Sequence, residues 1–284
     1  MTHFTAKDVA DYYDQTESHY KFWWKFEESL GLHYGIWNKE TKSLRQAILN
    51  TNIILAEMGG LTTAHNVLDA GCGIGGTSIF FAKNYGCRVT GITISHKQAA
   101  NAARFAGKNG VSEKATFQQM DYTATSFPDN TFDVVVAVES MQSAEDKSIF
   151  LNEMKRVLKP GGKFIVVDLF NTSDTVIEEQ KYVKTMFYGW AISEVLSTKK
   201  FIELADKSGF SIAEHRDVTK EVFPSVLRLF LIAFVGMWGS KLYELFVKKT
   251  SAFARNHYKT YFAQYFAYKC KLWKYEIIAF KNKK

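Results

Sequence analysis

The stretch NVLDAGCGIGGTSIF, residues 66–80, places four glycines within six positions, directly after an apolar run that ends in an aspartate. The apolar residues before the glycines predict a β-strand, and those after them predict a helix. Glycines at such a turn let a ligand contact the backbone beside the positive N-terminus of the helix. The spacing satisfies Gly-x-Gly-x-x-Gly (Gly71, Gly73, Gly76) and also Gly-x-Gly-x-Gly (Gly71, Gly73, Gly75), so it leaves two classes of cofactor open.

Short apolar strands alternate with helical patterns from this stretch to the C-terminus. The expected strands are NVLDA (66–70), RVTGITI (88–94), ATFQQMD (115–121), FDVVVAVES (132–140), KFIVVDLF (163–170, after a PGG turn at 160–162), one within 198–219, and KYEIIAFKN (274–282). The alternation predicts an α/β fold, a Rossmann-like, doubly wound, mostly parallel seven-stranded sheet with helices on both faces.

Helical segments rich in aromatic residues interrupt or precede this alternation. Residues 1–62 are interpreted as an N-terminal helical cap segment, and residues 63–284 as a ligand-binding domain. Within that domain, further helical cap inserts are expected at about 171–197 and 220–262. Since the sheet does not need these segments, we expect them to close over the binding site.

The composition is typical of a soluble globular protein, with 46% hydrophobic and 23% charged residues. The longest nearly apolar run, residues 226–238, contains Arg228 and is shorter than the roughly 20 residues that a membrane span needs. The N-terminus MTHFTAKDVADYYDQ has no apolar secretory core, so we expect a cytoplasmic protein. Three cysteines without a Cys-x-x-Cys pair are consistent with a reducing compartment and predict no metal site.

The net charge of +7 is concentrated near the C-terminus. Residues 241–284 hold eleven Lys or Arg and two acids. Nucleic acid would fit such a charge, but the aromatic helical pattern YKTYFAQYFAYKCKLW (258–273) has no consecutive basic block. We therefore expect a solvated basic face and no nucleic-acid partner. Peripheral contact with an acidic lipid surface is left open, and nothing in the pattern indicates an oligomeric state.

Asp69 distinguishes between the two classes of cofactor. Ligands of open parallel sheets bind at the carboxyl ends of the strands, so Asp69 would face the ligand. Its carboxylate would repel a pyrophosphate but attract the ammonium and sulfonium of S-adenosylmethionine. The second strand ends in Thr93 instead of a ribose-binding acid, and Thr93 and Gln98 offer neutral hydrogen bonds. Asp121 and Tyr122 could bind an adenine, although each of these residues could also have a purely structural role.

Together these features resemble the class I S-adenosylmethionine-dependent methyltransferases over about residues 66–218. The motifs that carry the resemblance are VLDAGCGIGG, VTGITIS, FPDNTFDVVVAVES and MKRVLKPGGKFIVVD. It implies S-adenosylmethionine as methyl donor and S-adenosylhomocysteine as product. LHYGIWNKETKSLRQA and VTGITISHKQA look most like the branch that holds tocopherol, sterol and sarcosine/dimethylglycine methyltransferases and the cyclopropane fatty-acid synthases.

That branch implies cofactor contacts, and this chain departs from it in two places. The implied contacts are Tyr34, Gly35, Asp69, Gly71, Cys72, Gly73, Thr93, Gln98, Asp121, Tyr122 and Val138. Where tocopherol-type enzymes carry Glu-Ser-Gly-Glu-His, this chain has ESMQS from Glu139, so Gln142–Ser143 replace the Glu-His pair. Where cyclopropane synthases carry Ser-Cys, this chain has Gly35–Ile36. The resemblance therefore names no substrate.

Methyl transfer needs a general base only if the acceptor must lose a proton. Glu139, at the end of the fourth strand, is the candidate for that base, although it could equally be a buried acid bonded to backbone donors. His33 and His257 lie in cap segments and are further possible bases, although we expect both at the surface.

Aromatic residues of the cap predict an apolar or aromatic acceptor. We expect Tyr34 to reach the cofactor, and Trp190, Phe230 or Trp238 to line the acceptor site. The sequence thus predicts transfer of a methyl group from S-adenosylmethionine to O, N or C of a small molecule under a helical cap. A lipid-modifying enzyme of the cyclopropane synthase type and a binding protein without catalysis are the alternatives.

Overall fold

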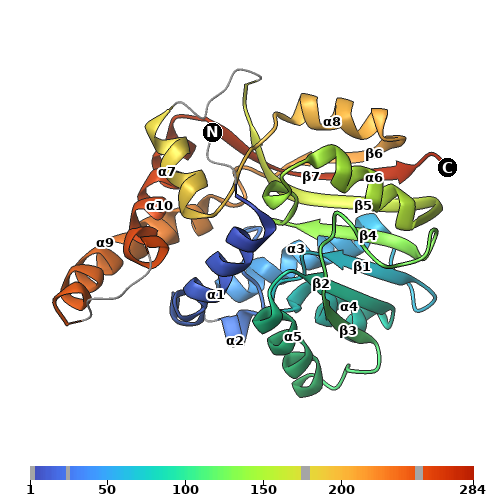
Figure 1. Ribbon diagram of the computed structural model, residues 1–284, viewed down its shortest axis with the longest axis horizontal. Helices are drawn as coiled ribbons and strands as arrows, with labels where there is room; N and C mark the ends of the chain where they lie inside the picture. The colour runs from blue at the N-terminus through green and yellow to red at the C-terminus, as the bar shows by residue number, and fades with distance from the viewer. Residues whose placement is uncertain (1–3, 24–25, 174–179, 247–251) are drawn as a thin grey trace.

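A computed structural model describes residues 4–23, 26–173, 180–246 and 252–284, and its centre is a seven-stranded sheet (Figure 1). The strands are β1 (Asn66–Ala70), β2 (Arg88–Thr93), β3 (Ala115–Gln119), β4 (Phe132–Val138), β5 (Leu158–Asn171), β6 (Phe210–Asp217) and β7 (Trp273–Asn282). Their order is β3-β2-β1-β4-β5-β7-β6. β7 pairs antiparallel with β5 and β6, and the other pairs are parallel. The predicted mostly parallel α/β fold is confirmed.

Helices cover both faces of the sheet. They are α1 (Ala6–Trp23), α2 (Phe26–Ser29), α3 (Leu44–Gly59), α4 (Gly76–Tyr85), α5 (His96–Lys108), α6 (Lys147–Val157), α7 (Lys181–Gly189), α8 (Thr198–Lys207), α9 (Phe223–Phe246) and α10 (Ala252–Lys269). Successive residues of β4 point to opposite faces: Val134 and Val136 pack in the cluster that includes α3, α4 and α5, whereas Val135 and Ala137 pack in the cluster with α6 and α8. Burial on both faces explains why this strand is an almost continuous apolar run.

Two boundaries differ from the expectation. Residues 160–162, expected to form a turn, belong to β5, where Gly161 has φ 71° and the pairing with β4 shifts in register. A glycine in the left-handed region lets the strand bend at that irregularity without ending. The second cap insert continues through α10 to Lys269, because the aromatic helical pattern does not stop at residue 262.

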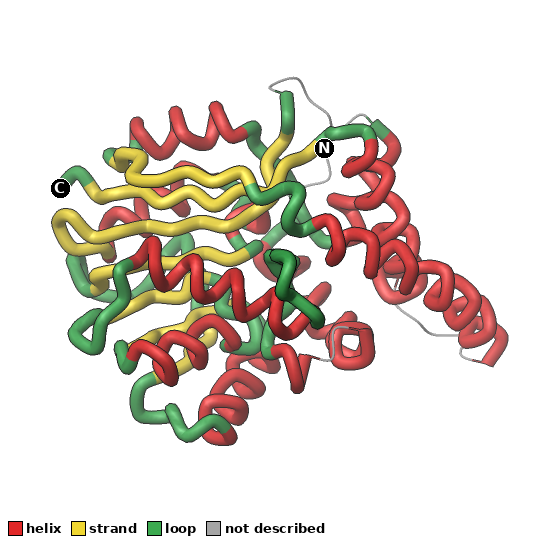
Figure 2. The backbone as a smooth tube through the Cα atoms, turned by 180° about the vertical axis from the view of Figure 1, so that it is seen from behind, coloured by secondary structure: helices red, strands yellow, loops and turns green. Residues whose placement is uncertain are grey.

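The helices α7 and α9 both pack against α10, and the three helices extend from the sheet at one end of the molecule (Figures 1 and 2). Trp37 connects this group to the N-terminal segment: its backbone N–H donates to the Glu221 carbonyl at 2.9 Å and its indole N–H to Ser225 Oγ at 2.8 Å. Within the described residues, no helix combines the length and the apolar character needed to cross a membrane.

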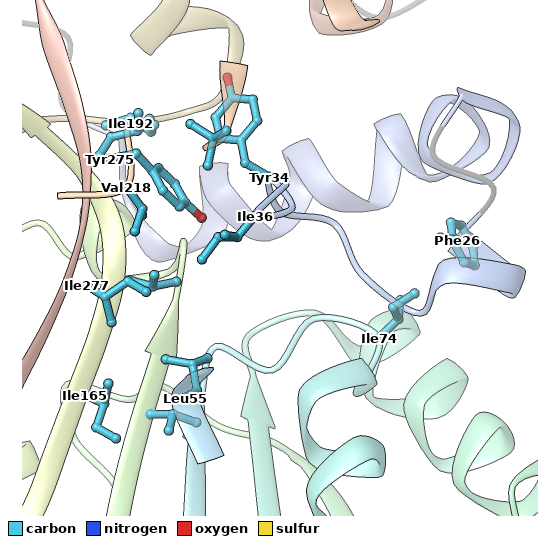
Figure 3. Close-up of a cluster of buried hydrophobic side chains, with 14 of the residues drawn as sticks. Phe26, Tyr34, Ile36, Leu55, Ile74, Ile165, Ile192, Val218, Tyr275 and Ile277 are labelled. Carbon is cyan, nitrogen blue, oxygen red and sulfur yellow. The ribbon is translucent and has the colours of Figure 1, made fainter. Parts of the chain in front are cut away.

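A buried cluster joins the N-terminal segment to the sheet (Figure 3). Tyr34 and Ile36 from that segment lie near Tyr275 of β7, and Leu55 of α3 lies near Ile165 of β5 (Figure 3). All five side chains are at most 5% exposed. Burial of side chains of this size stabilises a fold by roughly 1.5–3 kcal/mol each, so the cap segment is part of the core.

The last glycine of the turn allows the N-terminal segment to approach α4. A Cβ atom at Gly76 would overlap the carbonyl oxygen of Leu30. Leu30 itself has φ 54°, a conformation that a leucine rarely adopts without tertiary support. The bare backbone at Gly76 therefore permits the close contact between α4 and the N-terminal segment.

Replacing Gly76 by alanine is expected to destabilise the protein by about 1–3 kcal/mol, because the new methyl group overpacks the contact with Leu30. Urea unfolding measures the loss, and limited proteolysis of the N-terminal segment shows where it occurs. The matched control is Gly107→Ala in α5: the nearest atom to the added Cβ, Ser112 Oγ, lies 3.7 Å away. That variant should gain up to about 1 kcal/mol from helix propensity. Equal stability of both variants would contradict the assignment of Gly76.

Candidate functional site

A pocket opens at the carboxyl ends of β1, β2, β4 and β5, beneath α1 and the segment that precedes α3. Its empty space, including the open mouth, is about 1240 Å³. Ten of the twelve residues predicted to contact the cofactor or act as base line it: Tyr34, Asp69, Gly71, Cys72, Gly73, Thr93, Gln98, Tyr122, Val138 and Glu139.

Asp69 is the acid next to the glycine turn. Its side chain is 1% exposed, and Ser78 of α4 donates to its Oδ2 at 2.6 Å. Burial raises the pKa of Asp69 to about 6, since a carboxylate loses hydration there. A Cβ at Gly71 would overlap Ser140, so the floor of the pocket beside this acid is backbone. The arrangement can hold a cation next to exposed peptide groups.

Thr93 and Gln98 form a neutral pair at the end of β2. Thr93 Oγ1 donates to Gln98 Oε1 at 2.7 Å, and both side chains are buried. This bond leaves the Gln98 amide N–H groups as donors. The start of α5 is capped by Ser95, whose Oγ accepts from the Gln98 N–H at 3.1 Å, so Thr93 is not needed as a helix cap.

Gly35 and Asp121 do not line the pocket. A Cβ at Gly35 would overlap Ala47 of α3, so glycine is required there for packing. Asp121 Oδ1 accepts from the backbone N–H and the hydroxyl of Thr123 at 2.8 and 2.7 Å, which closes a local turn. Its neighbour Tyr122 does line the pocket.

Glu139 lies in the pocket between the cap and the sheet. Its Oε1 accepts from the Tyr34 N–H at 2.7 Å and from the Tyr275 hydroxyl at 2.6 Å. Burial raises the pKa of Glu139 to about 7 despite these two donors. Its φ of 46° is unusual for a residue with a long side chain, and such strain gathers at functional sites.

Asp168, at the carboxyl end of β5, is a pocket acid that the sequence reasoning missed. It is 2% exposed and accepts from the Leu169 N–H at 2.9 Å and the Gln142 N–H at 3.3 Å. Burial and the nearby Glu139 carboxyl raise the pKa of Asp168 well above its usual range. The signal was present in FIVVD, an acid directly after an apolar strand, which is the pattern that identified Asp69.

Gln142 presents an acceptor to the same region. It is 2% exposed, and its Nε2 donates to the carbonyl of Leu169. This bond fixes the orientation of the amide, because only the NH₂ group can face a carbonyl oxygen. Gln142 Oε1 is then buried without a protein hydrogen-bond partner among the described residues. An unsatisfied acceptor in a pocket indicates a place for a donor from a ligand or a water.

Tyr34 and Trp190 form an aromatic wall of the pocket, and Trp273 and Tyr275 pack against Tyr34 without lining the pocket. The Tyr34 ring stacks on Trp273 at 6.0 Å and meets Trp190 and Tyr275 edge-on at 6.2 and 5.6 Å. The Tyr34 hydroxyl donates to Gln264 of α10, which holds this ring in place.

Of the three predicted acceptor-site aromatics, only Trp190 is found in the pocket lining. Phe230 packs on Tyr265 of α10 at 4.0 Å, and the side chain of Trp238 lies outside the described part of the chain. α9 instead contributes Leu229 to the pocket.

The expectation of a surface position is wrong for His33, which is 7% exposed and lines the pocket. Burial lowers its pKa to about 4, so the ring is neutral near pH 7. In that state Nδ1 donates to the Tyr34 carbonyl at 2.8 Å. The side chain of His257 falls outside the described residues. Among the residues described, no group of His, Cys, Asp and Glu is arranged to hold a metal ion.

Sequence comparison finds a methyltransferase family. The model described as "Methyltransferase domain" matches residues 68–166. The chain is 35% identical to 2-methyl-6-phytyl-1,4-hydroquinone methyltransferase of Synechocystis over 72% of this chain and 66% of that protein. It is 30% identical to 27-O-demethylrifamycin SV methyltransferase of Amycolatopsis mediterranei over 68% and 71% of the two chains. The alignments with three sterol C-methyltransferases span only 44% to 47% of those proteins, about half of their length.

Structural comparison gives the same fold. The cyclopropane synthase MmaA2 from Mycobacterium tuberculosis superposes with a TM-score of 0.82 over 98% of each chain. The sequence identity of that pair is 15%, so the likeness concerns the fold alone.

Replacing Asp69 by asparagine is expected to weaken binding of S-adenosylhomocysteine by about 1–3 kcal/mol, the scale of a hydrogen bond to a charged group. Wild-type affinity should also fall as the pH drops through about 6, because protonation removes the charge that attracts the ligand ammonium. Calorimetry across this range measures both effects, and the variant should lose this component of the pH dependence. A folded variant that binds like the wild type would leave Asp69 with a structural role alone.

Proposed function

This chain belongs to the S-adenosylmethionine-dependent methyltransferases, and we propose that it methylates a small, partly apolar molecule that bears a hydrogen-bond donor. The observation that carries the proposal is the placement of two acids with raised pKa values in one pocket. Asp69 lies next to the glycine turn, and Glu139 lies against the aromatic wall. The first suits a cationic cofactor, and the second suits a proton-losing acceptor.

The residues of the glycine-turn side fit S-adenosylmethionine. The Asp69 carboxylate would hold the ammonium, and the pair Thr93 and Gln98 would bond the ribose hydroxyls. Tyr122 would lie beside the adenine, and the bare backbone at Gly71 would let the ligand approach. When bound, S-adenosylmethionine supplies an electrophilic methyl group and is released as S-adenosylhomocysteine.

The acceptor would bind between the aromatic wall and a group of hydrogen-bond acceptors. Glu139, Asp168 and Gln142 all line this region, and the buried Gln142 Oε1 has no hydrogen-bond partner among the described residues. An acceptor molecule with hydroxyl or amine groups on an apolar body satisfies both features. The Synechocystis relative is named for a hydroquinone, a ring with two hydroxyl groups. We propose a hydroxylated aromatic acceptor of that kind.

Glu139 would act as the general base. A pKa of about 7 means that the carboxyl is partly ionised near neutral pH and can still take a proton from the acceptor. The Tyr34 N–H and the Tyr275 hydroxyl hold its Oε1, which fixes the carboxyl toward the pocket. The N-terminal segment and Trp190 would exclude water, so that the acceptor stays aligned with the methyl group.

The alternative of a cyclopropane-forming enzyme is disfavoured by Gly35. Cyclopropane synthases carry a serine where this chain has Gly35. In this chain Ala47 occupies the space where a side chain at residue 35 would begin. We also propose the cytoplasm as the compartment, because Cys72, Cys87 and Cys270 are unpaired.

Transfer of a labelled methyl group from S-adenosylmethionine to a prenylated hydroquinone tests the proposal. Wild-type kcat should rise with pH through about 7, since only ionised Glu139 accepts a proton. Glu139→Gln should lower kcat by about 10²–10⁴-fold and lose this inflection, with unchanged affinity for S-adenosylhomocysteine. The control is Glu145→Gln, an exposed acid six residues further along the chain. Tight cofactor binding without transfer to any donor-bearing acceptor would favour a binding protein instead.

Gln142→Met tests the acceptor end of the pocket. Methionine keeps the length of the side chain but removes both the orphaned Oε1 and the Nε2 that donates to Leu169. KM for a hydroxylated acceptor should rise roughly 5- to 150-fold, which corresponds to a loss of about 1–3 kcal/mol of binding free energy. For an acceptor analogue that lacks one hydroxyl group, KM should rise less in this variant than it does for the parent compound. If KM rises equally for both compounds, Gln142 supports the fold of the loop and does not bind the acceptor.

A further inference from the structure

Exposed apolar side chains gather on the helices that extend from the sheet. The described residues include nine exposed large hydrophobic side chains, and six of them lie on α7, α9 and α10. These six, here called the apolar face, are Tyr182, Tyr188, Leu231, Phe234, Val235 and Phe266. Leu231, Phe234 and Val235 are 56%, 46% and 61% exposed, and their spacing of three and four residues places them on one side of α9.

Ring contacts make much of the apolar face continuous. Tyr182 of α7 stacks on Phe266 of α10 at 5.3 Å. Phe266 meets Phe230 of α9 edge-on at 6.0 Å, and Phe230 meets Phe234 at 5.2 Å. The exposed rings of Tyr182, Phe266 and Phe234, from three helices, thus belong to one surface, and contiguous surfaces of this kind mark interaction sites.

Charge of a single sign accompanies the apolar face. The segments 181–189, 223–237 and 258–271 contain six basic residues and no acidic residue. The basic residues are Lys181, Lys184, Arg228, Lys259, Lys269 and Lys271. Apolar side chains among cations are typical of helices that lie in the interface of an anionic lipid bilayer.

We propose that the apolar face docks the protein on an anionic membrane surface. A second copy of the chain would bring the same cations together, which opposes self-association through this face. Four of the six side chains are rings on which bases could stack, but the two most exposed, Leu231 and Val235, are aliphatic and fit acyl chains better than bases. Lipid headgroups satisfy the cations and acyl chains receive the apolar side chains, so a bilayer matches both properties.

The docked position would also supply the acceptor. Trp190 directly follows α7 and Leu229 lies on α9, and both line the pocket. Leu229 of α9 and Trp190 after α7 therefore connect the helices of the apolar face to the pocket wall. An apolar acceptor dissolved in the bilayer would reach the pocket without crossing water, which saves the cost of exposing its apolar part.

Vesicle co-sedimentation of the full chain tests the proposal, with vesicles of phosphatidylcholine alone and vesicles that also contain phosphatidylserine. The wild type should bind the anionic vesicles and bind them less at high salt. Removing both charges in Lys181→Gln/Lys184→Gln should lower the partition coefficient about 30-fold, at about 1 kcal/mol for each cation. Leu231→Ser/Val235→Ser should lower it at least tenfold, since two apolar side chains no longer enter the bilayer.

Ile149→Ser is the matched control, because Ile149 is 52% exposed but lies on α6. It should sediment like the wild type, and all variants should keep their melting temperature and their affinity for S-adenosylhomocysteine. The proposal is overturned if the wild type binds neither vesicle or if the Leu231/Val235 variant binds like Ile149→Ser. It is also overturned if the wild type is a dimer and the Leu231/Val235 variant is a monomer. Binding of the wild type to single-stranded RNA and not to vesicles would overturn it as well.

Discussion

The carboxylate of Glu139 connects three parts of the chain that are distant in sequence. It follows β4, it accepts from the Tyr34 N–H in the N-terminal segment, and it accepts from the Tyr275 hydroxyl in β7. An acid can remain in such an enclosed position only if hydrogen bonds replace part of its hydration. The bonds that orient Glu139 therefore also hold the cap on the sheet, so the pocket and its candidate base are formed by the same contacts.

The pocket contains three acids whose ionised carboxylates are destabilised by burial. Asp69, Glu139 and Asp168 all have pKa values raised by burial, so the folded protein holds protons there more tightly than an unfolded chain does. Stability from these groups is present at low pH and is lost as the pH rises toward their folded pKa values. A bound cation relieves the same electrostatic cost that a proton relieves. The pocket thus has a physical reason to prefer a cationic ligand over a pyrophosphate.

Rules that act locally predicted much of the fold and of the cofactor side of the site. Apolar runs predicted the strands. The rule that ligands bind at the carboxyl ends of parallel strands identified Asp69 and Thr93. The same rule applied to β5 would have found Asp168. The predictions that were wrong concerned residues whose positions depend on tertiary contacts. His33 is buried within the N-terminal segment, and Phe230 packs on Tyr265 because α10 lies beside α9. The bond from Tyr275 to Glu139 spans 136 residues and has no local signal.

The glycine turn shows why one motif fitted two cofactors. In a dinucleotide fingerprint the last glycine permits close packing of helix and strand. Here a Cβ at Gly76 would overlap Leu30 of the cap, whereas a Cβ at Gly75 would come within 2.7 Å of Phe117 and 2.9 Å of Ala102. Both glycines are therefore required by packing, and neither requirement depends on the ligand. Spacing alone could not separate the cofactors, and the discrimination rests on the charge of Asp69 beside the turn.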